Sequence, residues 1–386
     1  MKMQRVLIVT GIYPPDIGGP ASYARTLAQR LSKDYEVKII TYSSVRKFKQ
    51  DKDYLFKVNR VWKKNFWFFK HASYGLKVFF ACKNSDVVYS ISSLSGAIPS
   101  LVGARFFRKK FCLRIAGDYA WQVAIEKNKS SLLIDDFQKS KKTGWIGFLH
   151  NIQVQVCKNA DGIIVPSEYL AGIVRGWGIP KDKIKVIYNG VDFKPSELSK
   201  EEARRKIGIF GHLVLSAGRL VPWKGFRMLI KIMPSILEIN QAFRLIIVGD
   251  GPDRKMLESM IRNLGLGNKV YLVGQKTQEE LAIYMAAADM FVLNTGYEGF
   301  SHQILEAMTA GVPIITTAVG GNKEIIRQGE NGFMVKYQDE FNLVEAIKSL
   351  WQNPELREEF KKEGKKTAEK FSSEKMFEET VKVLIK

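Results

Sequence analysis

Apolar positions along the chain fall into short β-rich runs that alternate with segments of helical periodicity. The first forty residues pass from an apolar run (6–10) through a Gly/Pro loop (11–20) and an amphipathic segment (21–31) to a second apolar run (36–41). This order predicts two parallel strands joined by a helix, because parallel strands need a crossover connection between them. The chain therefore opens as an α/β protein.

The same alternation continues to about residue 190 and then restarts. In the first part, strands are predicted at 87–91, 111–115, 162–165 and 184–187, and helices at about 145–158 and 167–177. In the second part, strands are predicted at 213–216, 244–248, 270–273, 290–293, 313–316 and 332–335. This repetition predicts two Rossmann-like domains, each a doubly wound parallel sheet.

The boundary between these domains is expected between Asn189 and about Phe210, where an Asn-Gly turn signal precedes a polar segment. We therefore expect domains at residues 1–190 and 191–386, with the helical stretch 372–386 able to pack back on the N-terminal domain. Ligands of such sheets bind beyond the carboxyl ends of the strands. Two such domains facing each other predict an interdomain cleft.

The charge of the chain is unevenly distributed. Of the net charge of +21, residues 1–190 carry +19, while 46% of all residues are hydrophobic and 26% are charged. The composition fits globular domains and excludes a disordered or collagen-like chain. A strongly basic domain is typical of proteins that meet nucleic acid, an anionic membrane or phosphorylated substrates.

Cysteine and histidine positions argue against a metal site. Cys82, Cys112 and Cys157 lie among apolar residues without ligand spacing, so buried free thiols of a reducing compartment are expected. The four histidines form no zinc pattern. An Asp-x-Asp sequence at 51–53 lies in a weakly patterned basic stretch, and we interpret it as a solvated loop.

The chain shows no membrane-spanning pattern. Residues 6–13 are apolar, but they run directly into Pro14, Pro15 and Asp16, which favours a first strand over a signal peptide. The most apolar stretch, 66–80, is interrupted by Lys70 and Lys77, so no spanning helix is expected.

Candidate ligand-binding residues follow the predicted strands. Gly18 and Gly19 come after the first strand and precede Pro20, which suits the first helical turn, so this loop offers backbone N–H groups to an anion. A plain tight turn is the alternative. The loop is not GxGxxG and no acidic residue follows the second strand at ribose-binding distance, which disfavours a nicotinamide dehydrogenase.

Two cations and two carboxylates in the second half form a more specific pattern. Arg219 and Lys224 follow a strand in the segment SAGRLVPWKG, where they suit a diphosphate. Glu298 and Glu306 are separated by seven residues around the predicted start of a helix near Ser301. Carboxylates accept hydrogen bonds from sugar hydroxyls, and a helix start attracts phosphate.

With these motifs the chain resembles a retaining glycosyltransferase of family 4, which has the two-domain GT-B fold. The resemblance covers nearly the whole chain. It also rests on VIYNGVDF (186–193), VGDGPDRKMLE (248–258) and AVGGNKEII (318–326). It implies transfer of a hexose from a nucleoside diphosphate sugar with retention of anomeric configuration, with no cofactor or metal.

The resemblance also implies roles for individual residues. Arg219 and Lys224 would hold the donor diphosphate, and Gly18 and Gly19 would approach the distal phosphate. Glu298 would contact the donor sugar and Glu306 the ribose hydroxyls. Gly299, Phe300 and Ser301 would add backbone N–H groups.

The sequence departs from the family pattern after the strand at 111–115. Many members have a histidine before the glycine there, and Ala116 stands in its place before Gly117. Asp118, two residues on, is the best candidate to position the acceptor or stabilise positive charge at the sugar carbon. A role as a turn or cap residue is the alternative.

Cations and aromatic residues are interleaved between residues 46 and 83, and FFRKK follows at 106–110. This pattern is typical of a surface on anionic lipid, with ordinary solvated charges or nucleic-acid binding as alternatives. The expected membrane-facing residues are Lys63, Lys64, Trp67, Phe68, Lys70, Arg108, Lys109 and Lys110. The resemblance to family 4 also implies a membrane-facing surface, since many members of that family build lipid-linked glycans or glycolipids.

The sequence thus predicts a cytoplasmic enzyme held at the inner face of the membrane, acting on a lipid-linked or glycan acceptor and not on nucleic acid. Two other functions stay open at this point. One is a sugar-nucleotide epimerase of the same architecture, and the other is a basic nucleic-acid-binding protein.

Overall fold

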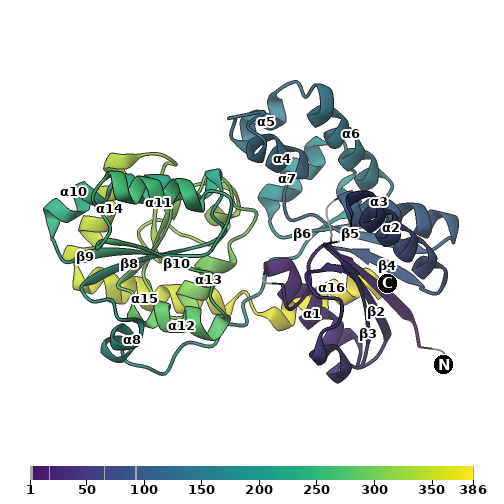
Figure 1. Ribbon diagram of the computed structural model, residues 1–386, viewed down its shortest axis with the longest axis horizontal. Helices are drawn as coiled ribbons and strands as arrows, with labels where there is room; N and C mark the ends of the chain where they lie inside the picture. The colour runs from purple at the N-terminus through teal and green to yellow at the C-terminus, as the bar shows by residue number, and fades with distance from the viewer. Residues whose placement is uncertain (1–2, 17, 65, 92–93, 386) are drawn as a thin grey trace. The chain divides into compact units, whose positions relative to one another are not determined.

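The computed structural model describes residues 3–16, 18–64, 66–91 and 94–385, with side chains left out for Trp67 and Phe68. The chain divides into two compact units. Unit 1 is Met1–Tyr188 together with Glu374–Lys386, and unit 2 is Asn189–Ser373. Each unit is a parallel sheet covered by helices (Figure 1).

The sheet of unit 1 has seven strands in the order β3-β2-β1-β4-β5-β6-β7. They are β1 (Arg5–Thr10), β2 (Glu36–Ser43), β3 (Lys57–Trp62), β4 (Val87–Ser90), β5 (Lys110–Arg114), β6 (Gly162–Val165) and β7 (Ile184–Val186). All neighbours pair in parallel, with Ile8 of β1 opposite Ile39 on one side and Tyr89 on the other. The strand order reverses between β1 and β4, which is where doubly wound sheets bind ligands.

Helices cover both faces of this sheet. They are α1 (Gly19–Leu31), α2 (Trp67–Lys83), α3 (Leu94–Phe106), α4 (Tyr119–Glu126), α5 (Ile134–Lys139), α6 (Gly144–Lys158), α7 (Glu168–Gly176) and α16 (Ser373–Ile385), with 3-10 turns η1 (Lys49–Asp53) and η2 (Lys181–Lys183). Leu27 of α1 and Phe377 of α16 share one core with Ile8 and Tyr89. The Tyr23 ring stacks on Phe377 at 5.7 Å.

The basic stretch between β2 and α2 is more ordered than the sequence predicts. It contains the strand β3. The side chains of this segment alternate only weakly between apolar and polar, and for that reason we expected the segment to be irregular. The interpretation of residues 51–53 as a solvated loop is wrong for Asp51. Its carboxylate accepts two hydrogen bonds from the guanidinium of Arg60, both at 2.7 Å.

Unit 2 repeats the architecture with six strands in the order β10-β9-β8-β11-β12-β13. They are β8 (His212–Ala217), β9 (Phe243–Val248), β10 (Val270–Gly274), β11 (Met290–Leu293), β12 (Ile314–Thr317) and β13 (Phe333–Val335). The order reverses between β8 and β11, which pair in parallel through Met290 and Val214.

Two apolar cores lie on the two faces of this second sheet. One face carries α8 (Lys200–Ile207), α12 (Gln278–Ala287), α13 (His302–Thr309) and α15 (Pro354–Glu369). The other carries α9 (Phe226–Lys231), α10 (Met233–Ile239), α11 (Arg254–Asn263) and α14 (Glu340–Gln352), and the 3-10 turns are η3 (Pro222–Lys224) and η4 (Gly320–Glu324). Figure 1 shows α10, α11 and α14 on the side of the sheet opposite α8, α12 and α15. The predicted fold class, two doubly wound parallel-sheet domains, is confirmed.

Candidate functional site

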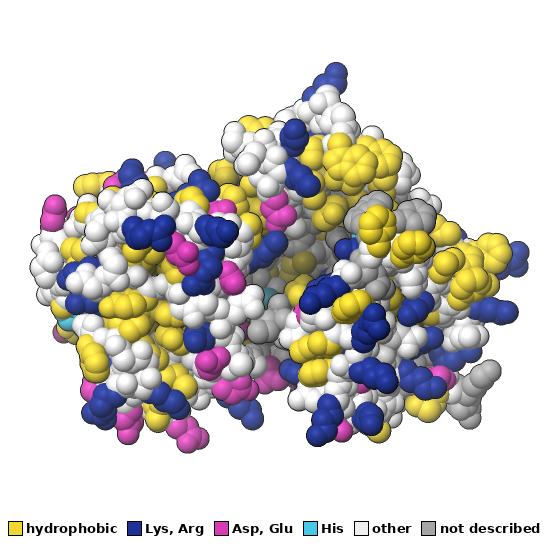
Figure 2. Space-filling view, viewed as in Figure 1, with side chains coloured by type: hydrophobic (Ala, Val, Ile, Leu, Met, Phe, Trp, Pro, Cys, Tyr) yellow, Lys and Arg dark blue, Asp and Glu magenta, His cyan; other side chains and the backbone are white. Residues whose placement is uncertain are grey.

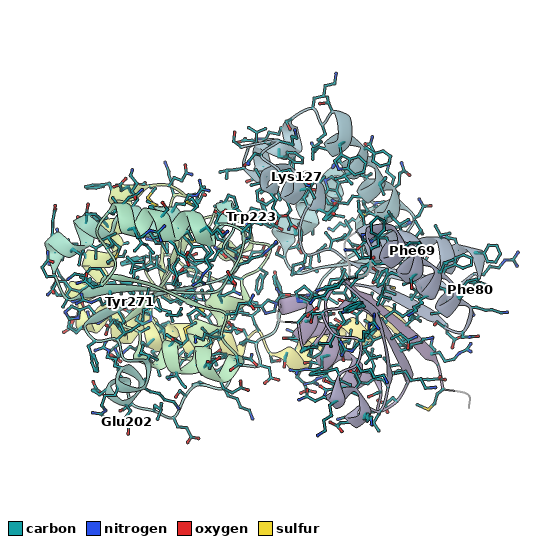
Figure 3. All side chains as sticks on the ribbon, viewed as in Figure 1. Phe69, Phe80, Lys127, Glu202, Trp223 and Tyr271 are labelled. Atoms are coloured by element: carbon teal, nitrogen blue, oxygen red, sulfur yellow. The ribbon has the colours of Figure 1, made fainter. Side chains whose placement is uncertain are left out.

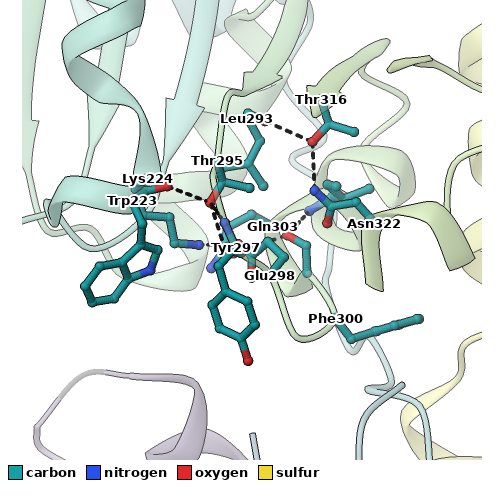
Figure 4. Close-up of polar contacts among 12 residues, drawn as sticks. Trp223, Lys224, Leu293, Thr295, Tyr297, Glu298, Phe300, Gln303, Thr316 and Asn322 are labelled. Carbon is teal, nitrogen blue, oxygen red and sulfur yellow. Dashed lines mark hydrogen bonds and ion pairs between the residues drawn. The ribbon is translucent and has the colours of Figure 1, made fainter. Parts of the chain in front are cut away.

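Two loops of unit 2 bring a cation and a carboxylate together at the point where the strand order reverses. Lys224 ends η3, after β8, and Glu298 lies in the loop after β11. The Lys224 ammonium forms an ion pair with the Glu298 carboxylate (Figure 4). Both side chains are largely buried, 13% and 12% exposed. The carboxyl ends of β8 and β11 therefore carry a charged pair at the place where such sheets bind ligands.

Close packing of the backbone holds this pair in place. Gly225 follows Lys224 with φ 65°, and a Cβ atom there would lie 1.6 Å from the carbonyl oxygen of Asn294. Only glycine fits, since it accepts the left-handed conformation and lacks the clashing atom. Asn294 itself is 1% exposed, and in the described part of the chain neither end of its amide has a hydrogen-bond partner.

Thr295 joins the two loops by hydrogen bonds. Its hydroxyl donates to the carbonyl oxygen of Trp223 at 3.0 Å, and the Gly296 N–H donates to the same oxygen at 2.6 Å. The Thr295 N–H donates to the hydroxyl of Thr317 at 3.1 Å. Thr295 was not among the residues predicted from the sequence, although a threonine two positions beyond a buried strand is a signal for such a contact. Figure 3 shows Trp223 at the edge of unit 2.

A second set of bonds holds the AVGGN segment against the same loop. The Asn322 amide of η4 donates to the hydroxyl of Thr316 at 3.0 Å, and that hydroxyl donates to the Leu293 carbonyl at 2.9 Å (Figure 4). The Gly321 N–H donates to the Glu298 carbonyl at 3.0 Å. The loop that carries Glu298 is thus fixed from two directions before any ligand binds.

The second glutamate lies on the helix that follows. Ser301 is the N-cap of α13, and its hydroxyl accepts a hydrogen bond from the Ile304 N–H at 3.3 Å. Phe300 is buried and its carbonyl accepts from the Asn189 amide at 2.9 Å. Glu306 is half-buried, and burial raises the pKa of its carboxyl to about 7. Because desolvation disfavours its charged form, a ligand that donates hydrogen bonds would favour ionisation.

Arg219 lies on the surface of unit 2, in the loop between β8 and η3. The neighbouring Leu220 is buried, and its N–H donates to the Asp250 carbonyl at 3.0 Å. The backbone that carries Arg219 is therefore fixed to the end of β9, while its side chain extends to the surface.

In unit 1, the glycine loop begins α1. Gly18 is the N-cap, Gly19 is the first helical residue and Pro20 occupies the first turn, as the sequence predicts. The N–H groups of Ala21 and Ser22 donate to the Gly18 carbonyl at 2.9 and 3.2 Å. This loop lies beyond β1, next to the reversal of the strand order.

Asp118 is the N-cap of α4 and is fully buried. Its carboxylate accepts from the Trp121 N–H at 3.1 Å, from the Gln138 amide at 2.8 Å and from the Gln153 amide at 3.5 Å. The structure thus gives Asp118 a capping role, and direct contact with a substrate would require these donors to move.

The expected membrane-facing residues lie on several elements. Lys64 and Arg108 are exposed, Lys70 and Lys109 are half-buried, and Lys63 forms an ion pair with Asp16 at 2.6 Å. Trp67 and Phe68 begin α2, but their side chains lie outside the described residues. Lys110 does not fit a lipid contact, because its ammonium donates to the Val383 carbonyl of α16 at 2.8 Å.

The described ranges of the chain contain neither a membrane-spanning helix nor a cluster of metal ligands. In the ranges of the chain that the structure describes, no helix is both long and apolar enough to cross a bilayer. Over the same ranges, no three His, Cys, Asp or Glu side chains gather as ligands for a metal ion. Cys82, Cys112 and Cys157 are free and buried, as the sequence predicts.

Two family descriptions match the chain, one for each half. "Glycosyltransferase Family 4" matches residues 17–194, and "Glycosyl transferases group 1" matches residues 199–367. The second match includes Arg219, Lys224, Glu298 and Glu306.

Curated relatives match over different lengths. An uncharacterized glycosyltransferase of Methanocaldococcus jannaschii, MJ1178, is 30% identical and aligns over 96% of this chain and 95% of its own length. Another from the same organism, MJ1607, is 36% identical over 53% of this chain and 54% of its own length. The lipopolysaccharide core biosynthesis glycosyltransferase LpsD of Rhizobium meliloti is 30% identical over 60% of this chain and 62% of its own length.

A solved structure with a similar fold is that of Alr3699/HepE from Anabaena in complex with UDP and glucose. It has a TM-score of 0.81 and 20% sequence identity, and the match covers 99% of both chains. At this identity the likeness shows the fold.

Proposed function

Because the chain belongs to the group 1, family 4 glycosyltransferases, which use nucleotide sugar donors, we propose that it transfers a hexose from a nucleoside diphosphate sugar to a membrane-associated acceptor. Membership in this family confirms the resemblance seen in the sequence. It also decides against a sugar-nucleotide epimerase. The retaining chemistry of the family applies to this enzyme.

The main evidence for the proposed donor site is the ion pair between Lys224 and Glu298. Lys224 would exchange its partner Glu298 for a diphosphate oxygen, and Arg219 would add a planar fork of donors from the same loop. Released from the lysine, the Glu298 carboxylate would accept hydrogen bonds from the sugar hydroxyls. Two fixed cations would then stabilise the charge that develops on the leaving nucleotide.

The groups around this pair have proposed roles in holding the donor. Glu306 would accept from the ribose hydroxyls, and N–H groups of Gly299, Phe300 and Ser301 would face a phosphate at the start of α13. Gly18 and Gly19 of unit 1 would approach the distal phosphate. The buried amide of Asn294 offers a donor and an acceptor beside Gly225, and a buried amide without partners costs about 1–3 kcal/mol. A polar ligand would recover that cost.

We choose UDP-glucose as the first donor to test, since the similarly folded Anabaena protein was solved with UDP and glucose. The direct experiment measures transfer and donor hydrolysis with UDP-, GDP- and ADP-sugars, each with and without EDTA. The proposal expects one nucleotide to support turnover and EDTA to leave the rate unchanged. Turnover that stops with EDTA and returns with a divalent cation would contradict the proposed metal-independent site.

The surface of unit 1 supports a membrane-associated acceptor. Exposed apolar side chains follow one stripe on each of three helices, and we call them the α2–α3–α6 patch: Phe66, Phe69, Leu76 and Phe80 at α2, Ile98, Val102 and Phe106 on α3, and Trp145 and Phe148 on α6. Figure 2 shows yellow apolar groups on this face with dark-blue cations around them, and Figure 3 shows Phe69 and Phe80 on α2.

Charge complementarity selects anionic lipid as the partner of the patch. The helices α2, α3 and α6 contain 17, 13 and 15 residues, and their sequences include no Asp or Glu. Lysine and arginine near an anionic bilayer contribute about 1 kcal/mol each, and apolar side chains add burial in the interface. The relative LpsD is named for lipopolysaccharide core biosynthesis, and we propose a lipid-linked acceptor for this enzyme by analogy with that name. We therefore propose that the enzyme acts at the cytoplasmic face of a membrane.

Charge reversal of Lys63, Lys64 and Lys70 tests this surface. The expected result is weaker sedimentation with anionic liposomes, while neutral liposomes bind poorly to both proteins. Lys63 also pairs with Asp16, so Lys64→Glu with Lys70→Glu alone gives the cleaner variant. Unchanged binding of that double variant would remove the membrane from the proposal.

A further inference from the structure

Asn294 carries a buried amide beside the lysine of the proposed donor site. The residue directly follows β11 and is 1% exposed. In the described part of the chain, neither the nitrogen nor the oxygen of its amide has a hydrogen-bond partner. Buried polar side chains in folded proteins are nearly always hydrogen-bonded, so this amide is an exception that needs a cause.

A second buried asparagine of unit 2 shows the ordinary arrangement. Asn331 is 0% exposed, and its amide nitrogen donates to the Ile325 carbonyl at 3.1 Å and to the Thr367 hydroxyl at 2.9 Å. Its amide oxygen accepts from the Arg327 N–H at 2.7 Å. These bonds explain why Asn331 is buried, whereas the described residues offer no such explanation for Asn294.

The amide of Asn294 lies against the turn that carries Lys224. A Cβ atom at Gly225 would be 3.1 Å from the Asn294 amide nitrogen, so the amide packs on the residue after the lysine. The stem of Lys224 passes Gly218, which follows β8, and lies 3.7 Å from a Cβ atom placed there. Since β8 and β11 are neighbouring parallel strands, their ends bring the lysine stem and the amide together.

Lys224 would need a further acceptor after it leaves Glu298. In this structure the Lys224 ammonium pairs with the Glu298 carboxylate, and in the proposed function it exchanges that carboxylate for a diphosphate oxygen. An ammonium carries three N–H donors on a flexible stem, so one phosphate oxygen does not satisfy all of them. The amide of Asn294 offers an acceptor oxygen next to the same turn.

We propose that Asn294 is a positioning residue for Lys224. Once the ammonium has turned from Glu298 to the donor diphosphate, the Asn294 amide oxygen accepts one of its N–H groups. The inference rests on the proposed donor site. Because the amide is unpaired without the donor and paired with it, donor binding removes an unfavourable desolvation that the donor-free protein carries. Asn294 thereby strengthens donor binding through the lysine, without touching the donor.

A pair of variants of equal size tests the role of the amide. Asn294→Thr keeps a hydrogen-bonding group at this position, and Asn294→Val replaces its hydroxyl with a methyl group. Calorimetry first measures UDP, GDP and ADP binding to the full-length protein, and the nucleotide bound most tightly is then titrated into the variants. We expect Asn294→Val to weaken binding by about tenfold and Asn294→Thr to weaken it less. Unchanged affinity in Asn294→Val, or an equal loss in both variants, would overturn the proposal.

Stability separates this positioning role from a structural one. Because the Asn294 amide makes no hydrogen bond with the described residues, Asn294→Val should unfold at the same denaturant concentration as the unchanged protein, or at a higher one. Asn331→Val is the matched control and should unfold at a lower concentration, since it breaks three hydrogen bonds. If both variants are destabilised equally, the Asn294 amide is paired in the donor-free protein and the proposal fails.

A double-mutant cycle shows whether Asn294 acts through Lys224. In a Lys224→Met protein, adding Asn294→Val should change the nucleotide affinity by no more than a factor of about two, because the lysine that the amide positions is gone. A loss as large as in the unchanged background would mean that Asn294 acts independently of the lysine, contrary to the proposal.

Failure of the proposed function gives a different result from failure of this inference. If none of the three nucleotides binds the unchanged protein, the donor site fails, and the role of Asn294 fails with it. If one nucleotide binds and Asn294→Val retains its full affinity, the donor site stands and the positioning role alone is refuted.

Discussion

Lys224 and Glu298 form an ion pair between the loops after β8 and β11, although 74 positions separate them in the sequence. In the proposed donor site, donor binding would exchange this ion pair for contacts with the donor. Loss of either partner leaves a largely buried charge unpaired.

Replacing Lys224 with methionine should lower kcat/KM for the donor by at least about 100-fold, since one cation facing a developing negative charge contributes about that much. Steady-state kinetics at varied donor concentration measures the effect. Lys231→Met is the matched control, because Lys231 pairs with Glu340 on the surface of the same unit. If both variants lose activity equally, Lys224 has no special role at the donor site.

Glu306 should make stability depend on pH. Its pKa is about 7 in the folded protein and near 4.5 when solvated, so the group favours the folded state below pH about 4.5 and loses this contribution as pH rises through 7. Glu306→Gln removes the titration. We expect the variant to gain stability relative to the unchanged protein between pH 5 and 8, by at most about 3 kcal/mol. Thermal denaturation at several pH values in that range measures the difference in stability between the two proteins. If their stabilities change in parallel with pH, Glu306 is not the titrating group.

The same residue should couple donor binding to proton release. If ribose hydroxyls donate to Glu306, binding favours its ionised form and lowers its pKa. Calorimetry of UDP binding near pH 6.5 in buffers of different ionisation enthalpy should reveal released protons. Glu306→Gln should release fewer, and identical proton counts for the two proteins would separate Glu306 from the nucleotide.

Gly225 should tolerate no side chain. Gly225→Ala places a methyl group against the Asn294 carbonyl and should cost more than about 2 kcal/mol of folding free energy, with loss of donor binding. Gly265→Ala is a sharp control, because Gly265 has the same φ of 65° but open space around it. Gly265→Ala should lower the free energy of unfolding by about 1 kcal/mol, from backbone strain alone. Chemical denaturation compares them, and equal losses would mean that the contact with Asn294 is unimportant.

The aromatic residues of the α2–α3–α6 patch should matter for lipid binding as much as the cations Lys64 and Lys70 do. Phe80 and Phe106 are 60% and 71% exposed, and replacing both with serine should weaken binding to anionic vesicles at least tenfold. Phe210 and Phe341 of unit 2 are 60% and 73% exposed and provide a matched pair. Their replacement should leave vesicle binding unchanged, and an equal loss would indicate nonspecific adhesion.

Strands were the easiest part of the fold to predict from sequence. Those buried on both faces read as continuous apolar runs, such as Met290–Leu293, and each ended near its predicted position. β3 was missed because it lies at the edge of its sheet, where side chains are only partly buried and the apolar pattern is weak.

The candidate site was predictable in its residues but not in its contacts. The spacing of Glu298 and Glu306 and the nearby cations pointed to one loop system, yet nothing local pairs Lys224 with Glu298, since only the sheet order brings them together. Asp118 also accepts hydrogen bonds from the side-chain amides of Gln138 and Gln153, which are distant in sequence. Buried polar contacts of this kind carry no periodic signal.

Helix α16 supplies part of the core of unit 1 from the C-terminal end of the chain. Met376, Phe377 and Leu384 belong to the core of unit 1, and Thr380 lies 3.3 Å from the hydroxyl of Tyr23. The ribosome synthesises this helix only after the whole of unit 2. Unit 1 is therefore translated first, but its core is complete only when Met376, Phe377 and Leu384 have been added at the end of synthesis.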